Sequence, residues 1–128
     1  GFISKYLDLS IINALVSVPM DAKKENARGF NQARLLTRLT AKKIKKEDLS
    51  PYLKKKNSKS AQSLLNKNQR RRNIEGSFFV SGLKIFSGRK ILLIDDILTT
   101  GFTASECSKT LRSAGAASVT LLAAARGL

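Results

Sequence analysis

The sequence predicts an α/β fold in which helices flank a mostly parallel, twisted sheet, and three consecutive segments near its carboxyl end carry that prediction. Residues Ile91–Ile94 form an uninterrupted apolar run, as expected of a strand buried on both faces of a parallel sheet. Residues Thr103–Ala114 have apolar side chains at helical spacing before Gly115, a favourable helix stop. Residues Val119–Ala125 supply a second buried strand. Strand, helix and strand in this order indicate a βαβ unit with its loop at the carboxyl edge of the sheet.

The amino-terminal third of the chain predicts a helix, a strand and a second helix. Apolar residues recur near helical spacing from Phe2 to Leu15, which predicts an amphipathic opening helix. The β-branched run Val16-Ser17-Val18 predicts a short strand that Pro19 ends. Asn31 is a suitable N-cap for a helix that extends to about Ile44.

The middle of the chain predicts a flexible basic segment. From residue 48 to residue 73 the sequence is rich in Lys, Asn, Ser, Gln and Arg, with few apolar residues to anchor it. Long loops of this kind in compact domains usually serve as lids or binding segments, so we expect a flap or hood here. A strand over Ile74–Val80 and a turn at Ser87-Gly88 then lead back to the sheet. We expect one domain over residues 1–128.

Composition excludes several classes of site and compartment. No apolar run approaches the roughly 20 residues that a membrane-spanning helix needs, and no secretion signal opens the chain, so we expect a cytoplasmic protein without a membrane span. Cys107 is the only cysteine, which excludes an internal disulfide and a zinc site built from several thiolates, and we expect it in the core. The sequence has no histidine, so catalysis by an imidazole base is excluded.

Positive charge is concentrated in one part of the chain. The net charge is +15, and the stretch from Lys23 to Arg72 holds 17 Lys or Arg residues against Glu25, Glu47 and Asp48, which leaves +14 there. Such a block attracts polyanions, because each phosphate contact releases counterions. The alternative is a solvated basic face that only keeps the protein in solution.

An acidic pair followed by a hydroxyl-rich turn is the most specific chemical feature. Asp95 and Asp96 end the apolar run, and a glycine and three threonines follow just before the next helix: Thr99, Thr100, Gly101 and Thr103. Hydroxyls, a glycine and a helix N-terminus together suit a phosphate, whereas the carboxylates suit sugar hydroxyls. A phosphorylated sugar meets both demands, and Mg²⁺ is expected to join mainly through the ligand. The alternative is a strand end followed by an ordinary helix cap.

Residues 91–103 closely resemble the signature of type I phosphoribosyltransferases, which bind 5-phosphoribosyl 1-pyrophosphate. Further pieces resemble one branch of that superfamily, the ComF/GntX group: Val18-Pro19 with Arg28–Ala33, then Gln62, Arg70, Asn73 and Gly76–Phe78, and finally Ala123–Arg126. Members of the group usually carry an amino-terminal zinc ribbon with four cysteines, which this sequence lacks. The resemblance implies a type I phosphoribosyltransferase fold with a flexible hood.

The resemblance also implies functional residues. Asp95 and Asp96 correspond to the catalytic acidic pair that holds the ribose hydroxyls. The ligand's phosphates correspond to a set that comprises Thr99, Thr100, Gly101, Phe102, Thr103 and Arg28. Single-stranded DNA is the expected partner of the basic segment, through Lys54, Lys55, Lys56, Arg70, Arg71 and Arg72.

The implied role is in DNA uptake and natural transformation, where other DNA-uptake proteins are potential partners. The alternative is an active phosphoribosyltransferase that uses an unidentified acceptor. Its reaction would displace pyrophosphate from the ribose, which needs positioning and neutralisation of the leaving group more than a strong base. The residues alone leave open whether a reaction occurs.

Overall fold

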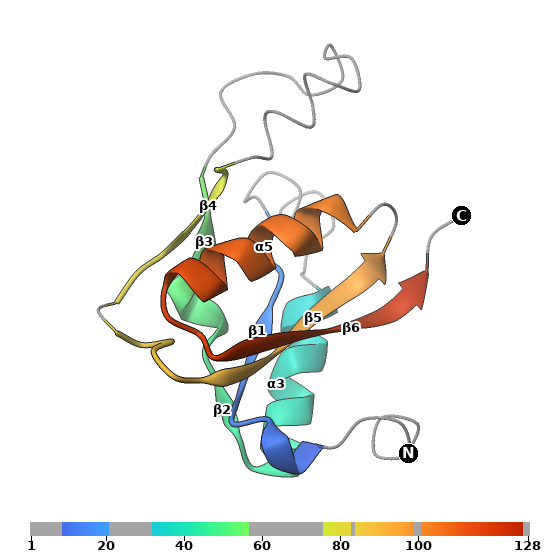
Figure 1. Ribbon diagram of the computed structural model, residues 1–128. Helices are drawn as coiled ribbons and strands as arrows, with labels where there is room; N and C mark the ends of the chain where they lie inside the picture. Colours follow the sequence, from blue (N-terminus) through green and yellow to red (C-terminus); the bar gives the residue numbers. More distant parts are fainter. Residues whose placement is uncertain (1–8, 21–31, 57–75, 83, 99–100, 127–128) are drawn as a thin grey trace.

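The computed structural model describes residues 9–20, 32–56, 76–82, 84–98 and 101–126, and the side chains at 96–98 and 124–126 lie outside that description (Figure 1). Its main sheet has four strands in the order β2-β1-β5-β6. They are β1 (Ala14–Ser17), β2 (Glu47–Asp48), β5 (Lys90–Leu98) and β6 (Ser118–Arg126). Each neighbouring pair is parallel. The parallel sheet that the sequence predicts is therefore confirmed.

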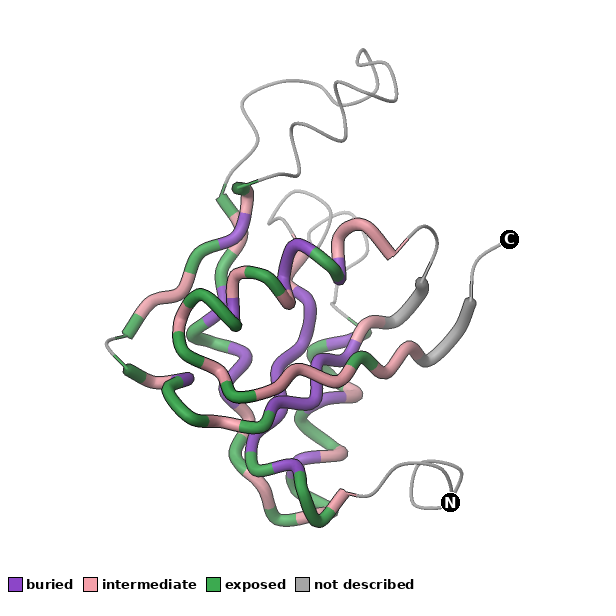
Figure 2. The backbone as a smooth tube through the Cα atoms, in the orientation of Figure 1, coloured by how far each residue is buried: buried purple, intermediate pink, exposed green. Residues whose placement is uncertain are grey.

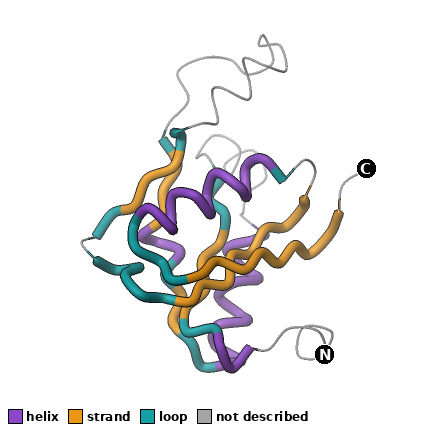
Figure 3. The backbone as a smooth tube through the Cα atoms, in the orientation of Figure 1, coloured by secondary structure: helices purple, strands orange, loops and turns teal. Residues whose placement is uncertain are grey.

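Two α-helices and a small hairpin complete the described part of the chain. The helices are α3 (Gln32–Ile44) and α5 (Phe102–Ser113), and short 3-10 turns lie at Leu9–Ile11 and Ser50–Tyr52. Strands β3 (Leu53–Lys55) and β4 (Phe78–Val80) pair antiparallel in a two-stranded sheet of their own. Figure 3 shows this hairpin set apart from the main sheet, with α5 beside it.

Side chains of the central strands alternate between two cores, one on each face of the sheet. Figure 2 shows that the backbone of these central strands is mostly buried. Ile91 and Leu93 of β5 lie on one face, in a cluster with Cys107 and Leu111 of α5. Leu92 and Ile94 lie on the other face, where α3 contributes Ala41, Leu36 and Ile44. All four β5 residues are fully buried. The continuous apolar run is thus explained by burial on both faces.

The opening helix expected from Phe2 to Leu15 is wrong where the structure describes it. A short 3-10 turn occupies Leu9–Ile11, and Ala14 and Leu15 belong to β1. β1 lies between β2 and β5: all of its residues pair with β5, and Ala14 and Leu15 also pair with β2. The sheet therefore overrides a weak helical spacing. Residues 2–8 of the expected helix lie outside the described residues.

The first residues of the expected flexible segment form a 3-10 turn and strand β3. Leu49 and Leu53 are 5% and 2% exposed and pack into the core that faces α5. The Leu49 amide donates to the Leu15 carbonyl oxygen (2.8 Å), and the Ser17 amide donates to Ser50 Oγ (2.9 Å). These contacts tie the start of the hairpin to β1, so residues 49–55 are ordered. Residues 57–73 of the expected flap lie outside the description.

The end of α5 matches the sequence expectation. Ala114 is the C-cap, and Gly115 follows with φ +101°, a left-handed conformation that favours glycine. A Cβ at position 115 would also lie 3.3 Å from the Ser87 backbone. The Gly88 amide donates to the Gly115 carbonyl oxygen (2.8 Å). This contact joins the turn before β5 to the turn before β6.

Candidate functional site

The candidate site lies where β1 ends beside Ile94 of β5. From β1 the chain passes through α3 to β2, whereas from β5 it passes through α5 to β6 on the other side of the sheet. The two connections therefore leave β1 and β5 in opposite directions. Open α/β sheets bind ligands at the point where neighbouring connections diverge in this way. The Val18 amide donates to the Ile94 carbonyl oxygen (2.9 Å). The chain after Pro19 and the chain after Ile94 thus start from adjacent positions.

Asp95 occupies the central strand at this edge. The sequence suggests that the strand ends at the acidic pair, but β5 continues to Leu98 because its ladder with β6 extends through Asp95, which pairs with Ala123. Asp95 is half-buried and continues the alternation of Ile91 and Leu93. Its carboxylate therefore belongs to the face of the sheet that α5 covers. Asp96 follows within β5, and its side chain lies outside the description.

Helix α5 begins at the part of the candidate site where the sequence predicts a bound phosphate. Gly101 is its N-cap, with φ 77° and ψ 0°, and no side chain caps the first turn. The first amides of a helix have no acceptor within the helix and carry partial positive charge. The first turn holds no acidic residue, and Phe102 and Thr103 are half-buried there. Thr99 and Thr100, the other two members of the expected phosphate turn, lie outside the described residues.

Charged side chains of three elements influence the pKa of the buried Cys107 thiol. The thiol is fully buried, as expected of a core residue, and this burial raises its pKa far above the ordinary value. The negative charge of Asp95 raises the pKa of Cys107 further, the positive charge of Lys55 partly offsets this, and Glu106 adds a smaller increase. Asp95 of β5 and Lys55 of β3 therefore both influence the same buried thiol. Sequence reasoning connected neither charge with Cys107.

The three consecutive lysines of the hairpin separate into two groups. Lys54 and Lys56 are exposed, whereas Lys55 is half-buried with its ammonium 5.8 Å from the centre of the Phe78 ring. Successive residues of a strand face opposite sides, which explains the division. Arg28 and the three arginines expected to contact nucleic acid lie outside the described residues: Arg70, Arg71 and Arg72.

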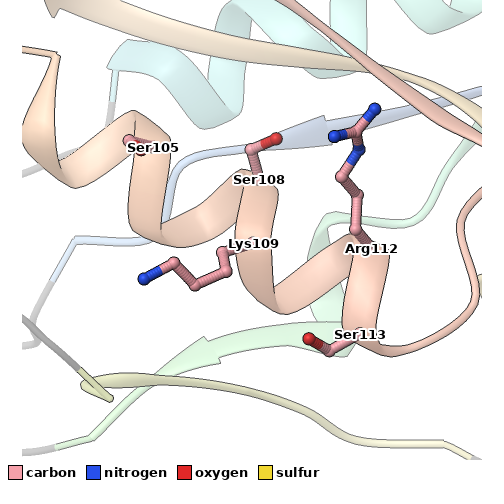
Figure 4. Close-up of a pocket in the computed structure, with 5 residues that line it drawn as sticks. All are labelled: Ser105, Ser108, Lys109, Arg112 and Ser113. Carbon is pink, nitrogen blue, oxygen red and sulfur yellow. The ribbon is translucent and has the colours of Figure 1, made fainter.

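A separate hollow of about 430 Å³ lies on the outer side of α5 (Figure 4). Lys109 and Arg112 extend away from each other there, between three serines of the same helix: Ser105, Ser108 and Ser113. Lys109 donates to the buried carboxylate of Glu106 (3.2 Å), which neutralises its charge. The helix separates this hollow from Cys107 and the sheet, so it is not the predicted sugar-phosphate site.

Within the described residues, no three His, Cys, Asp or Glu side chains gather into a group that could hold a metal ion. Among the helices described, none is long and apolar enough to cross a membrane.

Comparisons with known proteins agree on one type of domain. The model of the phosphoribosyl transferase domain matches residues 33–127. A solved structure described as the allosteric regulatory enzyme of purine biosynthesis superposes with a TM-score of 0.61, over 95% of this chain and 23% of that one. Its sequence identity is 15%, so it supports the fold alone.

Curated relatives are more similar in sequence. Competence protein F of Haemophilus influenzae is 31% identical over 119 residues, which cover 92% of this chain and 52% of the relative. DNA utilization protein YhgH of Escherichia coli K12 is 31% identical over 87% of this chain and 48% of its own length. Competence protein ComFC of Bacillus subtilis is 32% identical, over 80% and 40% respectively. The chain spans about half the length of these relatives.

Proposed function

Because the chain belongs to the ComF family of the phosphoribosyltransferase superfamily, we propose that it binds 5-phosphoribosyl 1-pyrophosphate and acts in DNA uptake. The observation that carries the ligand is that Asp95 lies on the central strand β5 at the switch point of the sheet and that the glycine-capped start of α5 follows the same strand. The names of the relatives support the DNA-uptake role.

The two parts of the site suit the two parts of this ligand. The 5-phosphate fits the first turn of α5, where Gly101 leaves room for close backbone approach and the helix dipole favours an anion. The ribose hydroxyls fit the carboxylate of Asp95, which accepts hydrogen bonds, and that of Asp96 is proposed to do the same. Thr99, Thr100, Phe102, Thr103 and Arg28 complete the proposed contacts.

Mg²⁺ belongs to the proposal as a companion of the ligand. Asp95 supplies the oxygen chemistry that Mg²⁺ prefers, but the described part of the chain has no dedicated cage of carboxylates. We therefore propose that the ion is held mainly by the pyrophosphate and hydroxyls of the ligand. When bound, Mg²⁺ would neutralise pyrophosphate charge.

Calorimetry with phosphoribosyl pyrophosphate and Mg²⁺ tests the binding proposal. Asp95→Asn removes a charge-assisted hydrogen bond worth about 1.5 to 3 kcal/mol, so affinity should fall by roughly 10- to 150-fold. Glu47→Gln is the matched control, because Glu47 is exposed and pairs with Ala14 at the opposite edge of the sheet. Wild-type protein that produces no binding heat, or equal affinities for the two variants, would overturn the proposal.

Single-stranded DNA is the proposed partner of the basic hairpin and the segment after it. Lys54 of β3 and Lys56, which directly follows β3, are exposed, as contacts with a phosphate backbone require. Each phosphate contact with a single strand contributes about −0.7 to the slope of log K against log[salt]. Replacing both lysines with glutamine should therefore reduce the slope by about 1.4. Lys90→Gln, at the amino end of β5, is the control.

The DNA proposal fails if wild-type affinity does not depend on salt. If wild-type affinity depends on salt but the double variant has the same salt slope as Lys90→Gln, then Lys54 and Lys56 do not contact the DNA. Arg70, Arg71 and Arg72 are the remaining proposed contacts. A cytoplasmic location and association with other DNA-uptake proteins complete the proposed role.

Transfer of the phosphoribosyl group to an acceptor is the second candidate function. The observation in its favour is the half-buried carboxylate of Asp95 at the proposed ribose position, where negative charge would stabilise a ribose ring that becomes positive. Release of pyrophosphate in the presence of candidate nucleobases tests it. Binding without release would leave the protein a ligand-binding member of its family.

A further inference from the structure

Lys55 has an environment unlike that of its two lysine neighbours. In the antiparallel hairpin it pairs with Phe78, and its ammonium lies 5.8 Å from the centre of that ring. Phe78 is 5% exposed and shares a core cluster with Cys107 of α5. The neighbouring Lys56 amide donates to the Ser77 carbonyl oxygen (2.7 Å), which holds the backbone in register. Lys55 is therefore directed to the inner side of the hairpin, toward α5.

The inner side of the hairpin is also the side on which Asp95 lies. β4 packs against α5, and α5 covers the face of the sheet that carries Ile91, Leu93 and Asp95. Both the Asp95 carboxylate and the Lys55 ammonium act on the Cys107 thiol, with opposite signs. The hairpin cation and the acidic end of β5 thus lie on the same side of the sheet, the side that α5 covers.

A cation in this position suits an anionic group bound next to the acidic residues. The first turn of α5 is taken by the 5-phosphate in the proposed function, which leaves pyrophosphate as the other anionic group of the ligand. Lysine on a strand presents a mobile ammonium with three donors, well suited to phosphate oxygens. Lys55 pairs across the hairpin with Phe78 and its ammonium lies over that ring, which limits the directions the ammonium can take.

We propose that Lys55 is a ligand-binding residue of the sugar-phosphate site and that its ammonium contacts the pyrophosphate of phosphoribosyl pyrophosphate. This inference rests on the proposed function. It assigns Lys55 to the ligand pocket, while Lys54 and Lys56 remain the proposed DNA contacts of β3. Because β3 leads directly into residues 57–75, the same contact links occupancy of the pocket to the hairpin that bears the basic segment.

Calorimetry of the full chain with three ligands separates the contributions. Lys55→Met keeps a long unbranched side chain opposite Phe78 and removes the charge. It should lower affinity for phosphoribosyl pyrophosphate and for pyrophosphate, each with Mg²⁺, by roughly tenfold or more. Affinity for ribose 5-phosphate should not change, because that ligand lacks the group that Lys55 contacts. Lys55→Arg should retain most of the affinity, and Lys90→Gln should behave like the wild type.

A second measurement uses the unmodified wild-type chain and does not depend on how a variant folds. Acetylation of Lys55 by a lysine-selective reagent is followed by mass spectrometry with and without ligand. Phosphoribosyl pyrophosphate should slow the acetylation of Lys55 several-fold, whereas ribose 5-phosphate should leave it unchanged. Acetylation of Lys90 should respond to neither ligand.

The outcomes distinguish this inference from the function on which it rests. Wild-type protein that binds none of the three ligands overturns both. If the wild type binds and Asp95→Asn weakens binding, but Lys55→Met binds like the wild type and Lys55 is not protected, only the inference fails. Equal losses for ribose 5-phosphate and phosphoribosyl pyrophosphate in Lys55→Met also overturn it, because they indicate a general structural role.

Discussion

Gly101→Ala tests both the helix cap and the ligand site in one substitution. Gly101 has φ 77° and ψ 0°, a left-handed conformation that costs an L-residue about 1 to 2 kcal/mol. Alanine also restricts the unfolded chain, which offsets up to about 1 kcal/mol of that cost. The expected net loss in the free energy of unfolding is about 1 kcal/mol. For a chain of this length, this lowers the Tm by roughly 3 to 6 °C.

Gly88→Ala is the matched control for this substitution. Gly88 has φ +71°, and a Cβ there would meet no atom within 4 Å, so the substitution adds the same strain without a clash. Gly88 lies in the turn before β5, away from the proposed ligand site. Both variants should therefore lose similar stability when thermal unfolding is followed by circular dichroism. Only Gly101→Ala should also weaken binding of phosphoribosyl pyrophosphate in calorimetry.

Two results would refute the reasoning about Gly101. A Gly101→Ala variant that unfolds at the wild-type temperature would mean that position 101 is not left-handed. A variant that loses stability like Gly88→Ala but binds the ligand as well as Gly88→Ala does would mean that the start of α5 is not the phosphate site. The first result concerns the cap alone, and the second concerns the ligand alone.

Three further predictions concern stability. Leu111→Ala should lower the free energy of unfolding by about 3 to 5 kcal/mol in denaturant titrations, because Leu111 is fully buried, whereas Leu39→Ala, at a 57% exposed position, should cost under about 1 kcal/mol. The pKa of Cys107 in the folded state lies above its ordinary value of 9.0, so the thiol of the unfolded chain deprotonates first as the pH rises. The contribution of Cys107 to the free energy of unfolding should therefore be fully present below pH 9 and fall by up to about 1.4 kcal/mol per pH unit above it. Cys107→Ala should lack this pH-dependent fall. The exposed pair between Arg89 and Glu47 (3.0 Å) should show a coupling free energy under about 1 kcal/mol in a double-mutant cycle.

The unit formed by β5, α5 and β6 could be predicted from the sequence because its signals are local. A continuous apolar run, a helical period and a glycine stop each follow from neighbouring residues. The extent of β5 could not be predicted in this way. Its last residues are paired with β6, more than 25 positions further along the chain, and that ladder carries the strand past the acidic pair.

The hairpin shows why Lys55 was not among the ligand residues expected from the sequence. Three consecutive lysines have no hydrophobic period, so nothing local distinguishes Lys55 from Lys54 and Lys56. The direction of Lys55 depends on its cross-strand pairing with Phe78, 23 residues away. A motif of residue types marks Asp95 and Gly101 as candidate site residues, whereas the proposed role of Lys55 depends on tertiary pairing.

The separation of the hairpin from the main sheet also affects how this protein can change during evolution. Residues on the two sides of segment 57–75 are joined by the Lys56–Ser77 backbone hydrogen bond (2.7 Å), and neither β3 nor β4 pairs with a strand of the parallel sheet. Closing a loop twice as long costs only about 0.6 kcal/mol more. Insertions and charge changes in this segment therefore leave the register of β1, β5 and β6 untouched. A natural or engineered relative can acquire a new specificity there while it keeps the same ligand pocket.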